Sequence, residues 1–413
     1  MSFDNNLEGY NAVQTMWYHY WNPSVNSFTT REPCKGARNG MFDCWSVAVA
    51  IHAIGDSAKY NREMTLPIVD QAIRSVGKYY NPKIGAYSVY NGGSYNSGTE
   101  DICYDDCAHL LRGFLACYEG TNNEQYLKMA KDLMKFLLGG IVTHEKFGYQ
   151  GLKWHYSKKY MSSISNCVSA TCAMKLIPYA QSDSEKKQLY DFARVCLDFI
   201  WNHMFDESDG LIWDGIGKDS DVIDKNKYTY NTGNTLTAMC LMYKYDGNPE
   251  WEKKCKTLAE AATHRGKTMF DRDYDDYGKR YWHDPSYFIQ LLIEGLADYL
   301  ETFDQKIPES TRNCCREEIA RHLSYFRKYC FDPQDNMYYS SFDIYRINPQ
   351  IYQRYQTEFG GHKSFQPCED DRVQGSCSVQ ERQCCKSLIG EASAGRIFFQ
   401  GARVFPKMDP RAC

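Results

Sequence analysis

Residues 104–138 read YDDCAHLLRGFLACYEGTNNEQYLKMAKDLMKFLL and carry the clearest structural pattern in the chain. In the first half, apolar residues recur at helical spacing, at Cys107, Leu110, Leu111, Phe114, Leu115 and Tyr118. After a polar turn at residues 120–123, a second stripe runs through Tyr126, Leu127, Ala130, Leu133, Met134 and Leu137. Because residues three and four apart share one helix face, the pattern predicts two amphipathic helices joined by a short turn.

The same pair of helices recurs along the chain, for example at residues 164–179 with 186–201 and at residues 236–245 with 251–264. Aromatic residues open the units, which are about 60 residues long, at Phe42, Tyr104, Tyr160, Tyr230 and Trp282. The first helix of each pair has few charges and many small residues, whereas the second carries Lys and Glu on one face. This asymmetry is typical of an inner helix covered by an outer one.

Six such pairs fit into 413 residues. We therefore predict an all-α chain that closes into an (α/α)6 barrel, a single domain over residues 1–413 whose cysteine-rich segment 305–413 closes the barrel. An open helical solenoid is the alternative, but it would not gather polar and aromatic groups in front of each inner helix. In a closed barrel these groups share one mouth, where we expect a ligand site. They include Asp43, Asp105, Asp106, Ser162, Ser163, Asn231 and Asp284.

The composition excludes several classes of protein. With 43% hydrophobic and 24% charged residues, the chain is typical of a folded globular protein. The formal charge of −4 and the lack of a basic block argue against a nucleic-acid partner. No apolar stretch approaches the roughly 20 residues that cross a bilayer, so we expect no membrane span. The chain has 33 Tyr, 20 Phe and 8 Trp. Exposed aromatic side chains can pack against the apolar faces of sugar rings, so this composition is a weak indication of a carbohydrate ligand. We expect a monomer.

The 18 cysteines become more frequent toward the end of the chain, and none of them forms a Cys-x-x-Cys pair. This pattern gives little support for a zinc or thioredoxin-type site and favours disulfides that pin the loop around Cys384 and Cys385. Disulfides imply an oxidising compartment, and we expect an extracellular or cell-wall location. The first 20 residues lack the features of a signal peptide, so an intracellular protein with many free thiols is the alternative.

Asp105 and Asp106 are the strongest candidates for catalysis. Acidic residues are common in the first turn of a helix for structural reasons, but two adjacent acids titrate as a coupled pair, with one ionised and one holding a proton. Neighbouring residues lie about 3.8 Å apart at Cα. Their carboxyl groups can therefore reach the roughly 5 to 5.5 Å of a retaining glycosidase more easily than the roughly 6.5 to 9.5 Å of an inverting one.

Other acidic clusters lack a ligand pattern. Asp275 and Asp276 sit where a calcium loop would need Gly at position 6, and Asp219, Asp221 and Asp224 have no metal spacing. We expect no metal and no cofactor, and we assign no catalytic role to His109 or His283. No nucleophile elbow, P-loop or dinucleotide-binding motif is present.

The paired Asp and the segments around it resemble glycoside hydrolase family 76, the endo-α-1,6-mannanases. The resemblance covers roughly residues 40 to 300 and rests on Tyr104-Asp105-Asp106 combined with five further segments, at residues 116–121, 126–131, 139–141, 210–215 and 229–233. It departs from the family after the paired Asp, where Cys107, Ala108 and His109 stand in place of Asn and Trp, and at Thr232, in place of Gln.

The resemblance implies an (α/α)6 barrel that cleaves α-1,6-mannan with retention of configuration. Asp105 would be the nucleophile and Asp106 the general acid/base. Asp214 and Asn231 would hold mannose hydroxyls, and Trp213 and Tyr230 would pack on sugar faces. With the residues of the predicted mouth and their neighbours, the expected substrate-binding set is Asp43, Trp45, Tyr104, Trp213, Asp214, Tyr230, Asn231 and Asp284.

Three alternatives to a mannan hydrolase stay open at the level of sequence. The first is a wall-remodelling mannan transglycosylase that uses the same covalent intermediate. The second is a catalytically silent glycan-binding homologue. The third, a sugar epimerase or an unsaturated uronyl hydrolase, rests on fold analogy alone.

Overall fold

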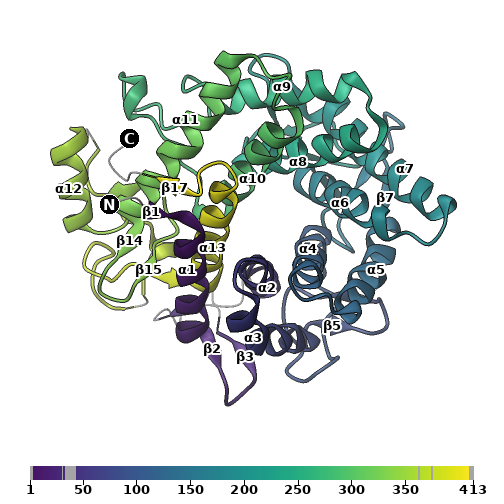
Figure 1. The fold of residues 1–413 in the computed structure, drawn as a ribbon, viewed down its shortest axis with the longest axis horizontal. Helices are drawn as coiled ribbons and strands as arrows, with labels where there is room; N and C mark the ends of the chain where they lie inside the picture. The colour runs from purple at the N-terminus through teal and green to yellow at the C-terminus, as the bar shows by residue number, and fades with distance from the viewer. Residues whose placement is uncertain (1–2, 30, 33–42, 361–362, 374, 409–413) are drawn as a thin grey trace.

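The structure is a computed structural model that describes residues 3–29, 31–32, 43–360, 363–373 and 375–408. Within these residues, an inner ring of helices surrounds the centre of the molecule (Figure 1). Each inner helix packs against the next in chain order, and the last packs against the first. The ring consists of α2 (Asp43–Tyr60), α4 (Tyr104–Thr121), α6 (Ser163–Leu176), α8 (Thr229–Asp246), α10 (Ser286–Phe303) and α13 (Leu388–Ala402). The predicted all-α (α/α)6 barrel is thereby confirmed.

An outer layer of helices covers the ring (Figure 1). Five outer helices pack mainly on one inner helix each, whereas α11 (Glu309–Tyr325) contacts both α10 and α13. This layer consists of α1 (Asn5–Tyr20), α3 (Arg62–Ser75), α5 (Glu124–Leu138), α7 (Asp183–Phe199), α9 (Pro249–Thr263) and α11 (Glu309–Tyr325). The apolar stripe predicted for the second helix of the 104–138 segment is the buried face of α5. An additional helix, α12 (Pro349–Phe359), lies outside both layers.

Small residues let the inner helices approach one another closely. A Cβ at Gly233 on α8 would lie 2.2 Å from the carbonyl oxygen of Leu291 on α10, and a Cβ at Gly295 would lie 2.3 Å from the carbonyl oxygen of Gly233. Only glycine fits at such contacts, so α8 and α10 touch backbone to backbone. The low charge and small side chains of the inner helices are therefore a packing requirement of the ring.

Short hairpins follow the outer helices and lead the chain back to the next inner helix. Four of them share one geometry: β2 (Trp21–Asn22) with β3 (Ser27–Phe28), β5 (Tyr80–Asn81) with β6 (Ala86–Tyr87), β10 (Phe205–Asp206) with β11 (Leu211–Ile212), and β14 (Phe331–Asp332) with β15 (Met337–Tyr338). In each turn an Asn or Asp side chain accepts the backbone N–H two residues later. Each turn also has one Asn or Gly with positive φ. These residues are typical of tight turns because they tolerate that conformation.

Four further small sheets complete the strands of the described chain. β7 (Ile141–Thr143) pairs with β8 (Gln150–Leu152), and β12 (Gly215–Gly217) lies between β13 (Ile223–Asp224) and β9 (Tyr160–Ser162). The chain ends meet where β1 (Phe3–Asp4) pairs with β17 (Lys407–Met408), and β4 (Arg31–Glu32) pairs with β16 (Lys386–Ser387).

The sixth helical pair joins the two ends of the chain. Its inner helix, α13, packs between α10 and α2, and its outer helix is α1, more than 360 residues earlier in the sequence. Of the predicted aromatic openers, Tyr104, Tyr160, Tyr230 and Trp282 lie within four residues of the start of an inner helix, whereas Phe42 lies outside the described residues. The single domain over residues 1–413 stays a prediction, supported by the packing of α13 in the ring.

The cysteines of the described chain differ between the helices and the tail, and the disulfides expected around Cys384 and Cys385 stay a prediction. Fourteen other described cysteines are free thiols, and eleven of these are buried. Many lie on inner helices, where a thiol acts as a small apolar side chain. Cys385 takes part in a disulfide, while Cys34 and Cys413 lie outside the described residues. Among the described helices, none is long and apolar enough to span a bilayer.

Candidate active site

A cavity of about 600 Å³ opens at the end of the barrel where the inner helices begin. Its size falls within the range of about 300–1,000 Å³ that is usual for ligand sites. Residues from the first turns of α2, α4, α6, α8 and α10 meet loop residues there. The lining includes Trp45, Asp101, Asp105, Asp106, His109, Trp154, His155, Lys158, Tyr160, Ser162, Asp214, Asp224, Tyr230 and Phe288.

Asp105, in the first turn of α4, is buried but accepts hydrogen bonds. Its Oδ2 accepts the indole N–H of Trp154 over 3.2 Å. Its Oδ1 is buried, with no hydrogen-bond partner among the described residues. Burial raises the pKa of Asp105 to about 7, against the effect of backbone N–H groups and Trp154, which favour the charged form. Asp105 is therefore the acid whose charged form is stabilised by donors, and at a pKa of about 7 it is partly ionised at neutral pH.

Asp106 lines the same cavity in a different environment. None of the described residues donates a hydrogen bond to its carboxyl group. Burial, followed by the charges of Asp105 and Asp101, raises the pKa of Asp106 well above its ordinary value. The pKa values of the two adjacent acids therefore differ, because Asp105 has donors that stabilise its charged form and Asp106 has none. The pair holds one charge on Asp105 and one proton on Asp106.

A second polar pair borders Asp106. His155 Nε2 and Asp101 Oδ1 lie 2.6 Å apart, and both residues line the cavity. Asp101 is half exposed, whereas His155 is buried. The pair places negative charge next to Asp106, which further favours its protonated form.

Aromatic rings from three inner helices form one wall of the cavity. The ring of Phe288 on α10 packs edge-on against Tyr230 on α8, with centroids 4.2 Å apart. It also stacks near Trp45 on α2, at 6.0 Å. Such rings suit the apolar faces of sugars.

Asp214, in the loop between β11 and β12, is fixed on the side of the cavity by three donors. The hydroxyl groups of Tyr160 and Tyr230 donate to its carboxylate over 2.9 and 3.0 Å, and Asn231 Nδ2 donates over 3.3 Å. Burial raises the pKa of Asp214, although these donors oppose the effect. This geometry fits the predicted role of a hydroxyl-binding carboxylate.

The structure brings five of the ten predicted site residues to the cavity lining: Trp45, Asp105, Asp106, Asp214 and Tyr230. Asn231 is fully buried behind the lining, where it positions Asp214. Contrary to the expectation from the sequence, Asn231 therefore does not reach the cavity to contact a sugar, but holds Asp214 in place through a hydrogen bond.

The other four predicted residues do not line the cavity. Tyr104 points outward and stacks on Phe136 of α5, with ring centroids 4.4 Å apart, because the helical turn places it on the face opposite to Asp106. Trp213 packs beneath Lys225. Both aromatic residues thus belong to the packing around the cavity.

Asp43 and Asp284 also have partners outside the cavity. Asp43 accepts a hydrogen bond from Asn91 over 3.3 Å, and burial raises its pKa to about 6. Asp284 accepts the backbone N–H of Thr229 over 2.6 Å and so caps the start of α8. Asp43 is itself the first residue of α2, whereas Asp284 lies two residues before α10 but caps α8.

The rival acidic clusters form turns and ion pairs, and one of the two histidines considered above lines the cavity. Asp276 accepts the backbone N–H of Gly278 over 2.8 Å within a turn, and Asp219 pairs with Lys159 over 2.9 Å. No group of three or more His, Cys, Asp or Glu in the described part of the chain could hold a metal ion. His109 lines the cavity, but burial and the nearby arginines lower its pKa to about 3, so it stays neutral.

The sequence did not identify several lining residues as part of the site, namely Asp101, Trp154, His155, Lys158, Asp224 and Phe288. It also did not predict that Tyr160 donates a hydrogen bond to Asp214. Most of these residues lie in loops and short strands without periodicity. The one available signal was the run of Trp154, His155 and Tyr156 within a polar loop, where exposed aromatic residues are a functional hint.

An ionised and a protonated carboxyl group beside an aromatic wall, at the mouth of a helical barrel, define the site of a glycoside-cleaving enzyme. Residues 8–338 match the model of Glycosyl hydrolase family 76. The chain belongs to this family.

A curated relative is the Meiotically up-regulated gene 191 protein of Schizosaccharomyces pombe, which is 27% identical over 98% of this chain and 93% of its own. Among solved structures, the family 76 mannosidase Bt3792 of Bacteroides thetaiotaomicron has a TM-score of 0.71 at 17% identity, covering 97% of this chain and 98% of its own. The α-1,6-mannanase of Salegentibacter sp. HEL1_6, solved as an inactive variant with α-1,6-mannotriose, has a TM-score of 0.69 at 16% identity, covering 97% and 100%. At these identities, the solved structures support the fold.

Proposed function

We propose that this protein is a retaining endo-acting hydrolase of α-1,6-mannosidic linkages. The observation that carries the proposal is the unequal environment of Asp105 and Asp106, which gives one cavity a charged and a protonated carboxyl group. The mannan substrate is supported by the solved relative in complex with α-1,6-mannotriose. That inactive variant carries two consecutive Asp-to-Asn substitutions, which fits a catalytic role for an adjacent pair.

In the first step, the carboxylate of Asp105 attacks the anomeric carbon as the bond to the glycosidic oxygen breaks. Asp106 gives its proton to that oxygen, so the leaving chain departs as an alcohol. A glycosyl ester on Asp105 results, and the proton lost leaves Asp106 ionised. In the second step, Asp106 takes a proton from water, the water oxygen attacks the anomeric carbon, and Asp105 is released. Two inversions give net retention.

The other lining groups bind and orient the sugar. Asp214, held by Tyr160 and Tyr230, would accept hydrogen bonds from mannose hydroxyls. Trp45 and Phe288 would pack against sugar faces. An extracellular or cell-wall location and a monomeric state fit this activity and remain part of the proposal.

The test uses the Asp105→Asn and Asp106→Asn variants, which keep the shape of each side chain. With unbranched α-1,6-mannan, each variant should lose at least about 100-fold in rate, the lower range for general acid–base catalysis. Retained activity in either variant would contradict the mechanism. Proton NMR of the first product should give the α-anomer, and a β-anomer would refute retention.

An acceptor mannooligosaccharide added to the same reaction distinguishes hydrolysis from transfer. Hydrolysis produces free reducing ends, whereas a transglycosylase produces longer chains. Binding of mannan without any product would instead indicate a silent glycan-binding protein.

A further inference from the structure

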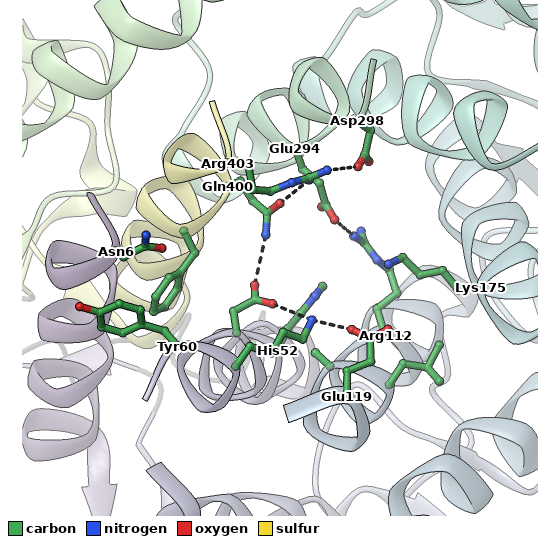
Figure 2. A pocket seen from close by; sticks show the side chains of 15 residues that line it. Asn6, His52, Tyr60, Arg112, Glu119, Lys175, Glu294, Asp298, Gln400 and Arg403 are labelled. Atoms are coloured by element: carbon green, nitrogen blue, oxygen red, sulfur yellow. Dashed lines mark hydrogen bonds and ion pairs between the residues drawn. The ribbon is translucent and has the colours of Figure 1, made fainter. Parts of the chain in front are cut away.

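A second cavity lies at the opposite end of the barrel, where the inner helices end. It has a volume of about 410 Å³ and is lined mainly by the C-terminal halves of α2, α4, α10 and α13 (Figure 2). Its lining is dominated by charged groups: Asp56, Lys59, Arg112, Glu119, Lys175, Glu294, Asp298 and Arg403. None of them contributes to the candidate active site.

The floor of this cavity is a buried ion-pair network. Arg112 pairs with Glu294 over 2.5 Å, and Arg396 pairs with Glu294 over 2.7 Å and with Asp56 over 2.8 Å. These four side chains are at most 7% exposed. Burial raises the pKa of Glu294, but Arg112 and Arg396 outweigh it and hold the pKa below its usual range. Glu294 is therefore ionised between two guanidinium groups, and Arg396 bridges it to Asp56.

The rim opens to water. Lys59 pairs with Glu119 over 2.5 Å and with Asp56 over 3.3 Å, and the side chains of Lys59 and Glu119 are 39% and 33% exposed. On the other side, Arg403 pairs with both Asp298 and Glu301. The charges at the rim are thus paired as well, and a small solute can reach the floor.

Lys175, in the last turn of α6, is the one cation of the described cavity lining that has no ion-pair partner. Its ammonium group forms no hydrogen bond or ion pair with any described residue, although it lines the cavity. Figure 2 shows its side chain pointing toward Arg112. Its charge lowers the pKa values of Glu119 and Glu294, so it acts on this cavity.

The charges of the cavity lining are equal in number, with the carboxylates Asp56, Glu119, Glu294 and Asp298 against the cations Lys59, Arg112, Lys175 and Arg403. Each of these carboxylates is already paired with a cation other than Lys175. The ammonium group of Lys175 is therefore left without a carboxylate, and an anion in the cavity would supply one.

His52 supplies a second polar group. It lines the cavity and is 8% exposed, and it has no hydrogen-bond partner among the described residues. Burial and the surrounding cations lower the pKa of His52 well below its ordinary value. A neutral imidazole has one N–H to donate, and a buried polar group without a partner is unfavourable.

We propose that this second cavity binds a small anion, a phosphate or a carboxylate, through the ammonium group of Lys175 and the imidazole N–H of His52. The anion would supply the partner that both groups lack. The cavity is distinct from the candidate active site and independent of the reaction proposed for it.

The test is a calorimetric titration of the full-length protein with inorganic phosphate and, separately, with acetate, at constant ionic strength. Saturable binding of one anion per protein is expected, and the two titrations distinguish the two sources of charge. Lys175→Met should weaken binding by about 10-fold or more, because one charge-assisted hydrogen bond is lost. Lys175→Arg should retain it.

Lys244 offers a matched control, since it lies in the last turn of the next inner helix, α8, and does not line the cavity. Lys244→Met should bind the anion as the wild-type protein does. A second variant keeps the test valid if Lys175→Met fails to fold: Glu119→Gln removes a neighbouring negative charge and should tighten binding several-fold. The proposal is overturned if neither anion binds saturably, if Lys175→Met binds as tightly as wild type, or if Glu119→Gln does not tighten binding.

Discussion

Replacing Trp154 with phenylalanine removes the indole N–H that donates to Asp105 Oδ2 over 3.2 Å, while an aromatic ring stays in the cavity wall. The lost hydrogen bond favours the charged form of Asp105, so its removal raises the pKa of that carboxyl group above about 7. A hydrogen bond to a charged group contributes about 1.5–3 kcal/mol, and one pKa unit corresponds to about 1.4 kcal/mol. The expected rise is therefore about one to two units.

The sign of the effect on activity follows from the role of Asp105. A nucleophile must be ionised, so kcat/KM rises with pH through its pKa. In Trp154→Phe this acidic limb should move to higher pH by about one to two units, which lowers kcat/KM by about 10- to 100-fold below the limb. Well above the new pKa, the difference should largely vanish.

The assay is kcat/KM for an α-1,6-mannooligosaccharide measured from about pH 5 to pH 9. Trp251→Phe is a matched control because Trp251 also donates its indole N–H to an aspartate, Asp246, over 3.0 Å, but far from the cavity. The control should keep the wild-type profile. An acidic limb at the same pH in Trp154→Phe and wild type would refute the reasoning, whatever the loss in rate.

Three further predictions concern residues that do not line the candidate active site. Tyr104→Phe should leave kcat/KM within about threefold of wild type, because the ring packs on an outer helix; a loss like that of Asp106→Asn would contradict this placement. Arg112→Met should lower the free energy of unfolding in urea by about 3 kcal/mol or more, since Glu294 loses one of its two buried partners; a change below about 1 kcal/mol would count against the network. Asp284→Ala should lower stability by about 1–2 kcal/mol through the lost acceptor for Thr229, with kcat unchanged in steady-state assays; a large fall in kcat would instead place Asp284 in the reaction.

The inner and outer helices could be predicted because their periodicity is local. The stripe from Cys107 to Tyr118 and the stripe of α5 follow from a spacing of three and four residues. The sixth pair could not be found in this way, because α1 and α13 lie at opposite ends of the chain and no local pattern relates them.

The hairpins show a signal that a search for helical repeats does not detect. Residues 21–28, 80–87, 205–212 and 331–338 share an aromatic residue, then Asn or Asp, and four residues later Asn or Gly. The physical basis is one turn with a side-chain cap and one positive φ. Such a motif marks four of the returns to the mouth of the barrel.

The sequence by itself determined the helical ring and the adjacency of Asp105 and Asp106, since both depend on spacing along the chain. It could not determine which acid keeps the proton, because that depends on Trp154, Asp101 and the depth of burial. Nor could it separate Tyr104, which faces an outer helix, from Tyr230, which faces the cavity. Only tertiary structure decides these points, because burial and hydrogen bonding bring together groups from segments that are distant in sequence.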